Sequence, residues 1–478
     1  MEVTLIGYVL IPLGIFLFFC STEYLYYILL FFAPFSASAI VNIKSITFGL
    51  QIPYYFGILF ILKLVISWFN SGNLKVSKTI LNLLMPIIVF WLIALMSLIM
   101  PIILEQKILV HYPEDPFYFS PLEFKRLHLT QFMYLTFVIL LMTFVSIYVN
   151  DKKRLYRSLK ILLISVIFVC IWGLYQFVGF YLHIPYLHWL FNNNIGYSQG
   201  WNQTIFGVVK RVSSVATEPS KLAKYLLWIF PLFSIIYVKT KEKLLSNSVT
   251  FFAIFLILLT ILLSTSTTGY FGLFFSLSVM SLYLLNLKKM MLRLKIVKST
   301  FLILSKSFIF VLLITVICGI VFLMFFKIDT KTLVDTLQFV TISKLQTQSG
   351  FERSTGAFKS LEIFFQSPLL GVGWGSNRSF DLNTTLLSNT GFLGFAFFWF
   401  FIYQILKQLY KINSNSHLPL KDRSLSLAFF FSIISGFFAH IVADPDIINL
   451  IMWVILGLSI SFIRLIKLEK KVHEKDNY

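Results

Sequence analysis

The sequence predicts an all-α integral membrane protein with about 12 to 13 transmembrane helices. Apolar residues make up 58% of the 478-residue chain and charged residues only 13%, and the mean hydropathy is +0.84. A typical soluble domain has about 45–50% apolar and about 25% charged residues. Because unpaired backbone groups are costly in lipid, apolar runs that cross a bilayer must form helices. We therefore expect a single integral membrane domain over residues 1–478.

The apolar runs have the length that a membrane-spanning helix needs, about 20 residues. Most of the loops between them are short. In chain order we expect spans at 3–20, 24–41, 46–68, 80–103, 128–149, 161–183, 221–238, 248–264, 270–287, 307–326, 387–406, 424–443 and 447–463.

The net charge of +20 would suggest a nucleic-acid partner in a soluble chain. Here most of the lysines and arginines outside the spans fall in alternate loops, with clusters at 152–154, 239–243, 288–306 and 464–475. The positive-inside rule assigns such loops to the cytoplasm. We therefore expect a multi-pass protein with a cytoplasmic C-terminus, in contact with membrane lipids and with no nucleic acid.

Three long segments then lie on the outer side, at 104–127, 184–220 and 327–386. Long ordered loops are usually functional, so we expect these three to form the active face. In the third, the spacing of Phe358, Leu361, Phe364 and Phe365 predicts a short amphipathic helix that suits a membrane interface. Pro368 would end it.

The outer side collects cations although its net charge is low. Arginine binds phosphate bidentately and stays charged. Fixed cations that hold a departing diphosphate lower the barrier of a transfer reaction, and a carboxylate or histidine could deprotonate an attacking hydroxyl. Glu218 is the preferred base, and His440 is a second candidate. The cations are Lys210, Arg211, Lys221, Lys224, Arg353, Lys359 and Arg378.

Lys221 and Lys224 lie on one face at the start of span 221–238. Two interpretations stay open. Their long side chains could extend to the lipid head groups, or they could bind an anionic ligand.

Two outer regions resemble the paired signature of the bacterial O-antigen polymerase and ligase superfamily, the Wzy-like polymerases. The first is 211–223, which reads RVSSVATEPSKLA. The second combines 353–356 (RSTG), 367–375 (SPLLGVGWG) and 387–395 (LSNTGFLGF). The order and the spacing of these pieces carry the resemblance, together with the expected topology along nearly the whole chain.

The resemblance implies a metal-independent glycosyltransferase of the C-type membrane class, with no cofactor. Such an enzyme joins oligosaccharide repeat units carried on undecaprenyl diphosphate into O-antigen or capsule polysaccharide. It works on the outer face of the bacterial cytoplasmic membrane, and a chain-length regulator and a flippase are expected partners. The family's donor-binding arginines match Arg211 and Arg353, and Lys210 and Arg378 would assist them.

One position departs from the ligase pattern. Ligases carry a histidine before the asparagine that leads into a late span, and here Ser388 precedes Asn389. This favours a polymerase that uses another base, such as Glu218. Asn389 and His440 are retained as expected substrate-binding residues.

Other functions remain open. A lipid-linked oligosaccharide flippase or exporter could have this length, charge and number of spans, although such proteins often show two similar halves. A ligase of the same superfamily is a second alternative. A metal-dependent glycosyltransferase is a third, and it would need an acidic pair such as 114–115 or Asp444 with Asp446. The turn at 264–269 could line a sugar site, and the glycosylation sequons that begin at Asn202, Asn377 and Asn383 are taken as incidental.

Overall fold

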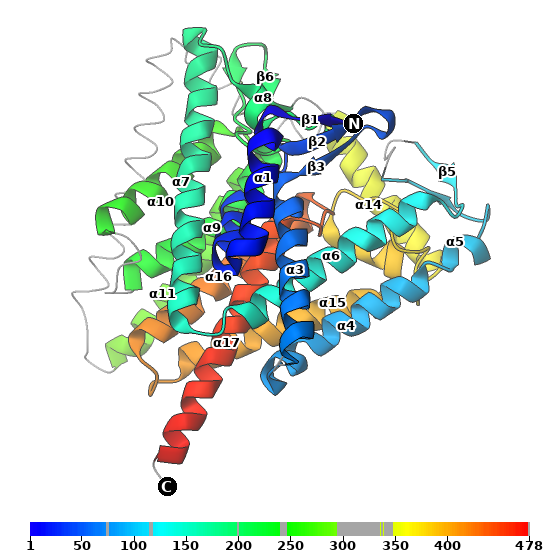
Figure 1. Ribbon diagram of the computed structural model, residues 1–478. Helices are drawn as coiled ribbons and strands as arrows, with labels where there is room; N and C mark the ends of the chain where they lie inside the picture. Colours follow the sequence, from blue (N-terminus) through cyan, green and yellow to red (C-terminus); the bar gives the residue numbers. More distant parts are fainter. Residues whose placement is uncertain are drawn as a thin grey trace. The chain divides into compact units, whose positions relative to one another are not determined.

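The computed structural model describes residues 1–72, 76–113, 118–197, 200–239, 246–293 and 348–476, together with positions 335 and 338. Within these residues the chain is mostly helical, and eight helices are long and apolar enough to cross a membrane (Figure 1). The prediction of a helical, multi-pass membrane protein is confirmed at this level. The predicted span 307–326 lies outside the described residues, as does part of the predicted loop 327–386.

The span-length helices agree with the predicted spans to within a few residues at most ends. They are α3 (Ile52–Ser71), α4 (Lys78–Ser97) with its continuation α5 (Met100–Ile103), α6 (Arg126–Tyr148), α7 (Lys152–Leu182), α9 (Pro219–Lys239), α15 (Leu382–Ser414), α16 (Leu420–Ala443) and α17 (Leu450–Asp476). Shorter apolar helices are α1 (Leu5–Cys20), α2 (Thr22–Phe32) and α10 (Asn247–Leu263). The remaining helices are α8 (His188–Phe191), α11 (Thr267–Arg293) and α14 (Gln348–Gln366).

The predicted span 24–41 is wrong in its second half. Helix α2 ends at Phe32, and residues from Ala39 onward form strand β2 (Ala39–Ile43). Pro34 explains the break, because proline has no backbone N–H to continue the helix and its ring collides with the carbonyl four residues earlier. The run beyond Pro34 is apolar and short, and periodicity alone cannot distinguish a buried strand from a helix there.

Outside the helices, three small antiparallel sheets form within the described residues of this mostly helical chain. Strand β2 pairs with β1 (Glu2–Val3) and β3 (Phe48–Gln51). Strand β4 (Leu109–Val110) pairs with β5 (Ser120–Pro121), and β6 (Thr204–Ile205) pairs with β7 (Val209–Lys210). The last two sheets lie within predicted outer loops.

The chain divides into two compact units. Unit 1 comprises Met1–Ser67, Tyr156–Thr341 and Leu418–Gly436, and unit 2 comprises Trp68–Leu155, Ile342–His417 and Phe437–Tyr478. In unit 1, helix α9 packs against α10 and α11, and β2 packs against α1. Nearly every residue of α9 is buried, so this helix forms the core of its unit. The prediction of a single membrane domain over 1–478 stays a prediction.

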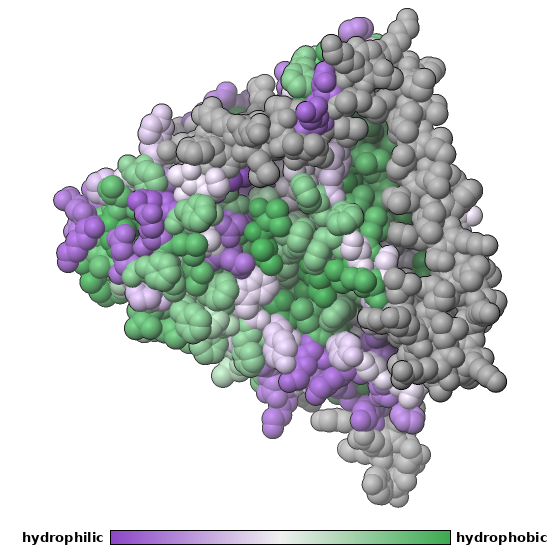
Figure 2. Space-filling model, turned by 180° about the vertical axis from the view of Figure 1, so that it is seen from behind, coloured by the Kyte–Doolittle hydropathy of each residue, from purple (hydrophilic) through white to green (hydrophobic). Residues whose placement is uncertain are grey.

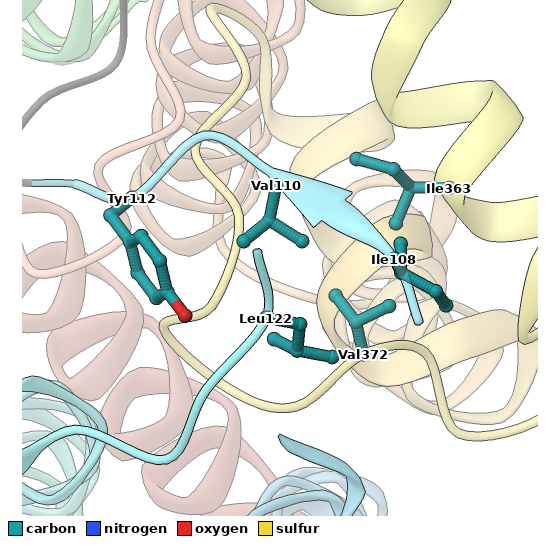
Figure 3. Packing of buried hydrophobic residues seen from close by; sticks show 6 residues of the cluster. All are labelled: Ile108, Val110, Tyr112, Leu122, Ile363 and Val372. Atoms are coloured by element: carbon teal, nitrogen blue, oxygen red, sulfur yellow. The ribbon is translucent and has the colours of Figure 1, made fainter. Parts of the chain in front are cut away.

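In unit 2, α4 packs against α15 and α6, and α17 packs against α6. Helix α14 packs on α15 and on strand β4. Figure 3 shows the small core of this region, in which side chains from the β4–β5 region, from α14 and from the turn after α14 point toward one another. The cluster consists of Ile108, Val110, Tyr112, Leu122, Ile363 and Val372.

Large apolar side chains also cover much of the surface. Phe16, Leu62 and Met85 lie on apolar helices and are between 47% and 63% exposed. Figure 2 shows broad hydrophobic areas on one face of the molecule. Large exposed apolar surfaces are uncommon in soluble monomers, and lipid would cover them in a membrane.

Candidate functional site

The segment of unit 1 that includes residues 201–214 is held in place by one amide in the middle of a helix. Gln176 of α7 is buried, and its Oε1 accepts the backbone N–H groups of Ser213 and Ser214 at 2.9 and 2.8 Å. Its Nε2 donates to the carbonyl of Trp201 at 2.9 Å and to the Ser213 hydroxyl at 3.3 Å. The signature segment 211–217 is therefore a fixed turn, anchored to α7 by a fully used side chain.

Ser214 lies at a strained position in this turn. Its φ of +51° is in the left-handed region that non-glycine residues seldom adopt. The strain is offset by three hydrogen bonds. The Ser214 hydroxyl donates to the carbonyl of Val169 at 2.7 Å, and its own carbonyl accepts from Asn192 Nδ2 at 2.9 Å and from the Tyr186 hydroxyl at 3.3 Å. Burial raises the pKa of Tyr186, so this hydroxyl remains a donor at neutral pH.

Arg211 begins the turn, and two neutral groups orient its guanidinium. Its Nε donates to Thr265 Oγ1 at 3.2 Å, and its Nη1 donates to Gln203 Oε1 at 3.1 Å. Its backbone N–H bonds to the carbonyl of Gln203 at 3.1 Å. Thr265 belongs to the turn between α10 and α11, which sequence analysis considered only as a possible sugar contact. The structure shows that this turn helps to position the arginine.

Lys210 is more enclosed than its place in an outer loop predicts. The side chain is on strand β7 and the residue is 3% exposed. Its Nζ donates to the carbonyl of Trp201 at 2.6 Å and lies 5.3 Å from the ring centroid of Phe180. Burial lowers the pKa of Lys210 to about 8, because the charged form loses hydration.

Glu218 lies where the signature turn becomes helix α9. The helix begins at Pro219, a residue suited to the first helical position. The Glu218 carbonyl accepts the N–H groups of Lys221 and Leu222, both at 3.1 Å. The hydroxyl of Ser220 donates to the Glu218 carboxylate at 3.2 Å. The carboxylate is partly exposed, so it is oriented while remaining accessible.

The two lysines of α9 have different environments. Lys221 is partly exposed, with its Nζ 5.9 Å from the ring centroid of Tyr197. Lys224 is 2% exposed, because its helix is buried among neighbouring helices. Extension to lipid head groups is therefore wrong for Lys224, since its side chain ends inside the protein.

Next to the signature turn, unit 1 has a partly open cavity of about 370 Å³. It is bounded by α8, by the segment that follows it, and by the residue immediately before Glu218. Its lining residues are Ala37, His188, Asn192, Asn193, Asn194, Ile195, Tyr197, Gly200, Trp201 and Thr217. Sequence analysis placed most of these residues only in the segment 184–220, because their proximity to one another depends on how the loop folds.

Unit 2 contains the other predicted site residues. Arg353 lies on α14 and is partly exposed. Arg378 is fixed more firmly. Its backbone N–H donates to the carbonyl of His111 at 2.7 Å, and its Nη2 lies 3.8 Å from Asp446 Oδ2. This carboxylate would compete with any anionic ligand of Arg378.

Helix α14 covers the segment in which sequence analysis predicted a short amphipathic helix. Its buried side is formed by Gly356, Ser360 and Ile363, whereas Phe358 is 70% and Phe365 74% exposed. The aromatic face therefore points away from the packed side of its unit, as an interfacial helix requires.

Asn389 is buried inside unit 2, with its amide engaged by backbone groups. Its Oδ1 accepts the N–H of Asn377 at 3.0 Å, and its Nδ2 donates to the carbonyls of Asn377 and Thr385 at 2.5 and 2.7 Å. Asn389 therefore fastens the turn after α14 to helix α15. Its role in substrate binding stays a prediction.

Asn377 is a residue whose role sequence reasoning missed. It is 2% exposed, and its Nδ2 donates to the hydroxyls of Ser360 and Ser388, each at 2.9 Å. Its Oδ1 accepts the N–H of His111 at 3.1 Å. The side chain thus joins α14, α15 and the strand region before Tyr112. The only signal in the sequence was a sequon, which pointed to the wrong chemistry.

The glycine-rich pieces of the second signature region form one structural unit. Helix α15 is interrupted at Gly391, which has φ +64° and ψ −169°. The interruption frees backbone groups on both sides of it. The carbonyls of Ser388 and Asn389 accept the N–H groups of Val372 and Gly373 at 2.8 and 3.1 Å, and the N–H of Phe392 donates to the carbonyl of Pro368 at 2.8 Å. The turn therefore completes the hydrogen bonding of the broken helix.

His440 is fully buried near the end of α16, with its Nδ1 3.3 Å from the carbonyl of Asp444 and 3.8 Å from the Asp444 carboxylate. Asp446 donates its N–H to Asp444 Oδ1 at 3.2 Å. In the part of the chain that the structure describes, no group of three or more His, Cys, Asp or Glu residues could hold a metal ion. The acidic pair 114–115 lies outside the described residues.

The predicted residues thus fall into two sets. Lys210, Arg211, Glu218, Lys221 and Lys224 belong to unit 1, and Arg353, Arg378, Asn389 and His440 belong to unit 2. Comparison with known protein families finds no family model that matches the chain, and no curated protein matches its sequence.

Proposed function

We propose that this protein is a glycosyltransferase that polymerises oligosaccharide repeat units carried on undecaprenyl diphosphate, at the outer face of a bacterial cytoplasmic membrane. The observation that carries the proposal is the construction of the turn from Arg211 to Glu218. An arginine and a carboxylate lie at its two ends, and buried hydrogen bonds from Gln176 fix the backbone between them. A fixed turn of this kind suits catalysis, because preorganised charges need little rearrangement as the reaction proceeds.

The proposed reaction uses the arginine and the carboxylate at the two ends of this turn. A hydroxyl oxygen of the acceptor saccharide attacks the anomeric carbon of the donor saccharide. The bond from that carbon to the diphosphate oxygen breaks, and undecaprenyl diphosphate leaves with the electron pair. Arg211 binds the diphosphate as its charge grows, and the Glu218 carboxylate accepts the hydroxyl proton. Arg353 is the second donor-binding arginine, supplied by α14, and Lys210, Lys221 and Arg378 add positive charge.

Complementation tests this proposal. A strain of the source bacterium that lacks its own copy would receive Arg211→Ala, Arg353→Ala or Glu218→Gln, and long-chain surface polysaccharide would be measured by gel electrophoresis at matched expression. We expect each variant to lose long chains. Arg157→Ala is the matched control, because Arg157 forms an exposed ion pair with Glu23 and should leave the polymer unchanged. Normal polymer from both arginine variants would contradict the proposed diphosphate clamp.

A second experiment separates polymerisation from transport. The purified protein would be reconstituted in liposomes with its lipid-linked repeat unit, and chain extension and movement across the bilayer would be followed together. Extension on one face, without net movement, supports the polymerase. Movement without extension would identify a flippase instead.

A further inference from the structure

The cavity of unit 1 has the size of a small-ligand site. Its volume of about 370 Å³ is near the lower limit of ligand pockets, which span roughly 300–1,000 Å³. Such a space suits one or two sugar rings better than a long lipid chain. Three asparagines and a threonine contribute polar groups to its wall, and a histidine, a tyrosine and a tryptophan contribute rings.

Two polar atoms of the cavity wall are buried and unsatisfied. Thr217 is 4% exposed, and neither its Oγ1 nor Nδ2 of Asn193 forms a hydrogen bond within the described residues. Buried polar groups nearly always have a partner, because leaving one unpaired is costly. The Asn193 amide cannot simply rotate to find one, since its Oδ1 already accepts the N–H of Ala39 at 2.7 Å. Both atoms are almost completely covered by neighbouring atoms, so a hydroxyl-rich ligand would satisfy them only once the lining side chains shift.

Aromatic rings form another part of the wall. The rings of His188 and Trp201 stack with centroids 4.5 Å apart and planes within 6°, and Tyr197 is a third lining ring. The C–H groups of a sugar ring carry a slight positive charge and pack well on the negative face of an aromatic ring. Rings beside amides are therefore the combination that a sugar ring needs, whereas a lipid chain would leave the amides unpaired.

The residues that line the cavity also favour ligands without a charge. No aspartate, glutamate, lysine or arginine is among the described residues that line the cavity. Two nearby lysines lie outside the lining: Lys221 Nζ is 5.9 Å from the ring centroid of Tyr197, and Lys210 Nζ donates to the Trp201 carbonyl. A neutral sugar is therefore the matching ligand.

The cavity adjoins the proposed catalytic turn. Thr217 directly precedes Glu218, and Gly200 packs so closely on this junction that a Cβ atom there would lie 2.0 Å from the Thr217 carbonyl oxygen. The carbonyl of Trp201 receives hydrogen bonds from both Lys210 and Gln176. Hydrogen bonds and close packing therefore connect the cavity wall to the signature turn.

We propose that this cavity is a saccharide subsite that holds one neutral sugar ring of the repeat unit next to Glu218. The inference rests on the proposed function for its substrate class, but binding of free sugar tests it independently. Thr217 and Asn193 hydrogen-bond the hydroxyl groups of the sugar, and Trp201 contacts a face of the ring.

The test is saturation-transfer NMR on the full-length protein in detergent micelles. The probes are the methyl glycosides of glucose, galactose, N-acetylglucosamine and rhamnose, with methyl glucuronide as the charged comparison. We expect at least one neutral glycoside to bind more tightly than the glucuronide. Trp201→Ala should weaken that binding about tenfold, and Thr217→Val, which keeps the shape of the side chain, about threefold. Trp189→Ala is the control, because Trp189 is on α8, 44% exposed and not among the lining residues.

The outcomes are distinct. Absence of transfer from every neutral glycoside to the wild-type protein would overturn the inference, as would equal binding by Thr217→Val and wild type. Failure of the two proposals can be told apart. Glycoside binding that depends on Trp201, in a protein whose Arg211→Ala variant still makes long polymer, would keep the subsite and refute the clamp. Loss of long polymer in Arg211→Ala, together with no glycoside binding by the wild-type protein, would support the clamp and refute the subsite.

Discussion

The two signature regions stabilise their turns by different means. In unit 1, side chains hold the backbone of 211–217, chiefly Gln176, Asn192 and Tyr186. In unit 2, the turn 367–375 is held mainly by backbone-to-backbone hydrogen bonds with the interrupted part of α15. The first arrangement leaves a cavity with unpaired polar atoms in its wall, whereas the second is closed packing in which glycines let two backbones meet.

The two regions that were first recognised as one paired sequence pattern therefore have different structural roles. Glycines and prolines in the second region are explained by the fold, because they allow a break in a helix to be covered. The polar residues of the first region exceed what anchoring of the turn requires. We therefore expect unit 1 to respond to changes in side-chain chemistry and unit 2 to changes in backbone geometry.

The largest effect should come from Gly391→Ala in unit 2. A Cβ atom at Gly391 would lie 2.2 Å from the carbonyl oxygen of Leu369, and its φ of +64° disfavours other residues. The strain and the collision together should cost about 3 kcal/mol or more of the free energy of unfolding. Gly72→Ala is the matched control, because Gly72 has φ +63° with nothing within 4 Å of its Cβ position, and it should cost only about 1–2 kcal/mol. Equal melting temperatures in detergent for the two variants would show that Gly391 is not closely packed against Leu369.

The next effect tests unit 1 through Gln176→Leu. This change leaves the N–H groups of Ser213 and Ser214 buried without their acceptor, at about 2–4 kcal/mol in total. Thermal unfolding should show the loss, and limited proteolysis should detect exposure of the turn. Gln51→Leu removes one hydrogen bond, to the Tyr197 hydroxyl, and should cost about 1 kcal/mol or less. A Gln176→Leu protein as stable as this control would show that the turn is not anchored by α7.

The substitution Asn377→Ala tests how much side-chain hydrogen bonds contribute to the stability of unit 2. It removes the bonds to the hydroxyls of Ser360 and Ser388 and leaves one buried N–H unpaired, so we expect a loss of about 2 kcal/mol in unfolding free energy. Asn383→Ala removes a single bond from the Trp399 indole and should cost about half as much. A negligible effect of Asn377→Ala on the melting temperature would sharpen the contrast, since only backbone contacts would then hold this region.

The last prediction concerns the pH dependence of unit 1. Burial lowers the pKa of Lys210 to about 8 from its usual 10.5. Between these values the unfolded chain binds more protons at this position than the folded chain, so stability rises with pH from about 8 to about 10.5. Below pH 8 both states are protonated and the slope vanishes. Melting temperatures of wild type and Lys210→Met across this range should diverge in slope, and parallel curves would show that the lysine is solvated.

Much of the architecture could be predicted from the sequence because apolar length determines the helices. The predictions failed where chain length and hydropathy no longer distinguish structures. Residues 39–43 are mostly apolar and form a strand, since Pro34 ends the preceding helix. For the candidate site, Arg211 and Glu218 could be found from a motif. The cavity could not, because its wall unites Ala37 with residues from His188 onward, which only the folded backbone brings together.

The interrupted helix α15 has a consequence for how the chain is made. Its break at Gly391 exposes backbone groups that are costly in lipid, and their partners lie at 368–373, about twenty residues earlier. The turn at 368–373 is therefore synthesised before Gly391. Because the partner is already synthesised, the interrupted segment never needs to wait in the membrane for a distant part of the chain. The order of the two motifs along the sequence matches the order in which a membrane-inserting chain needs them.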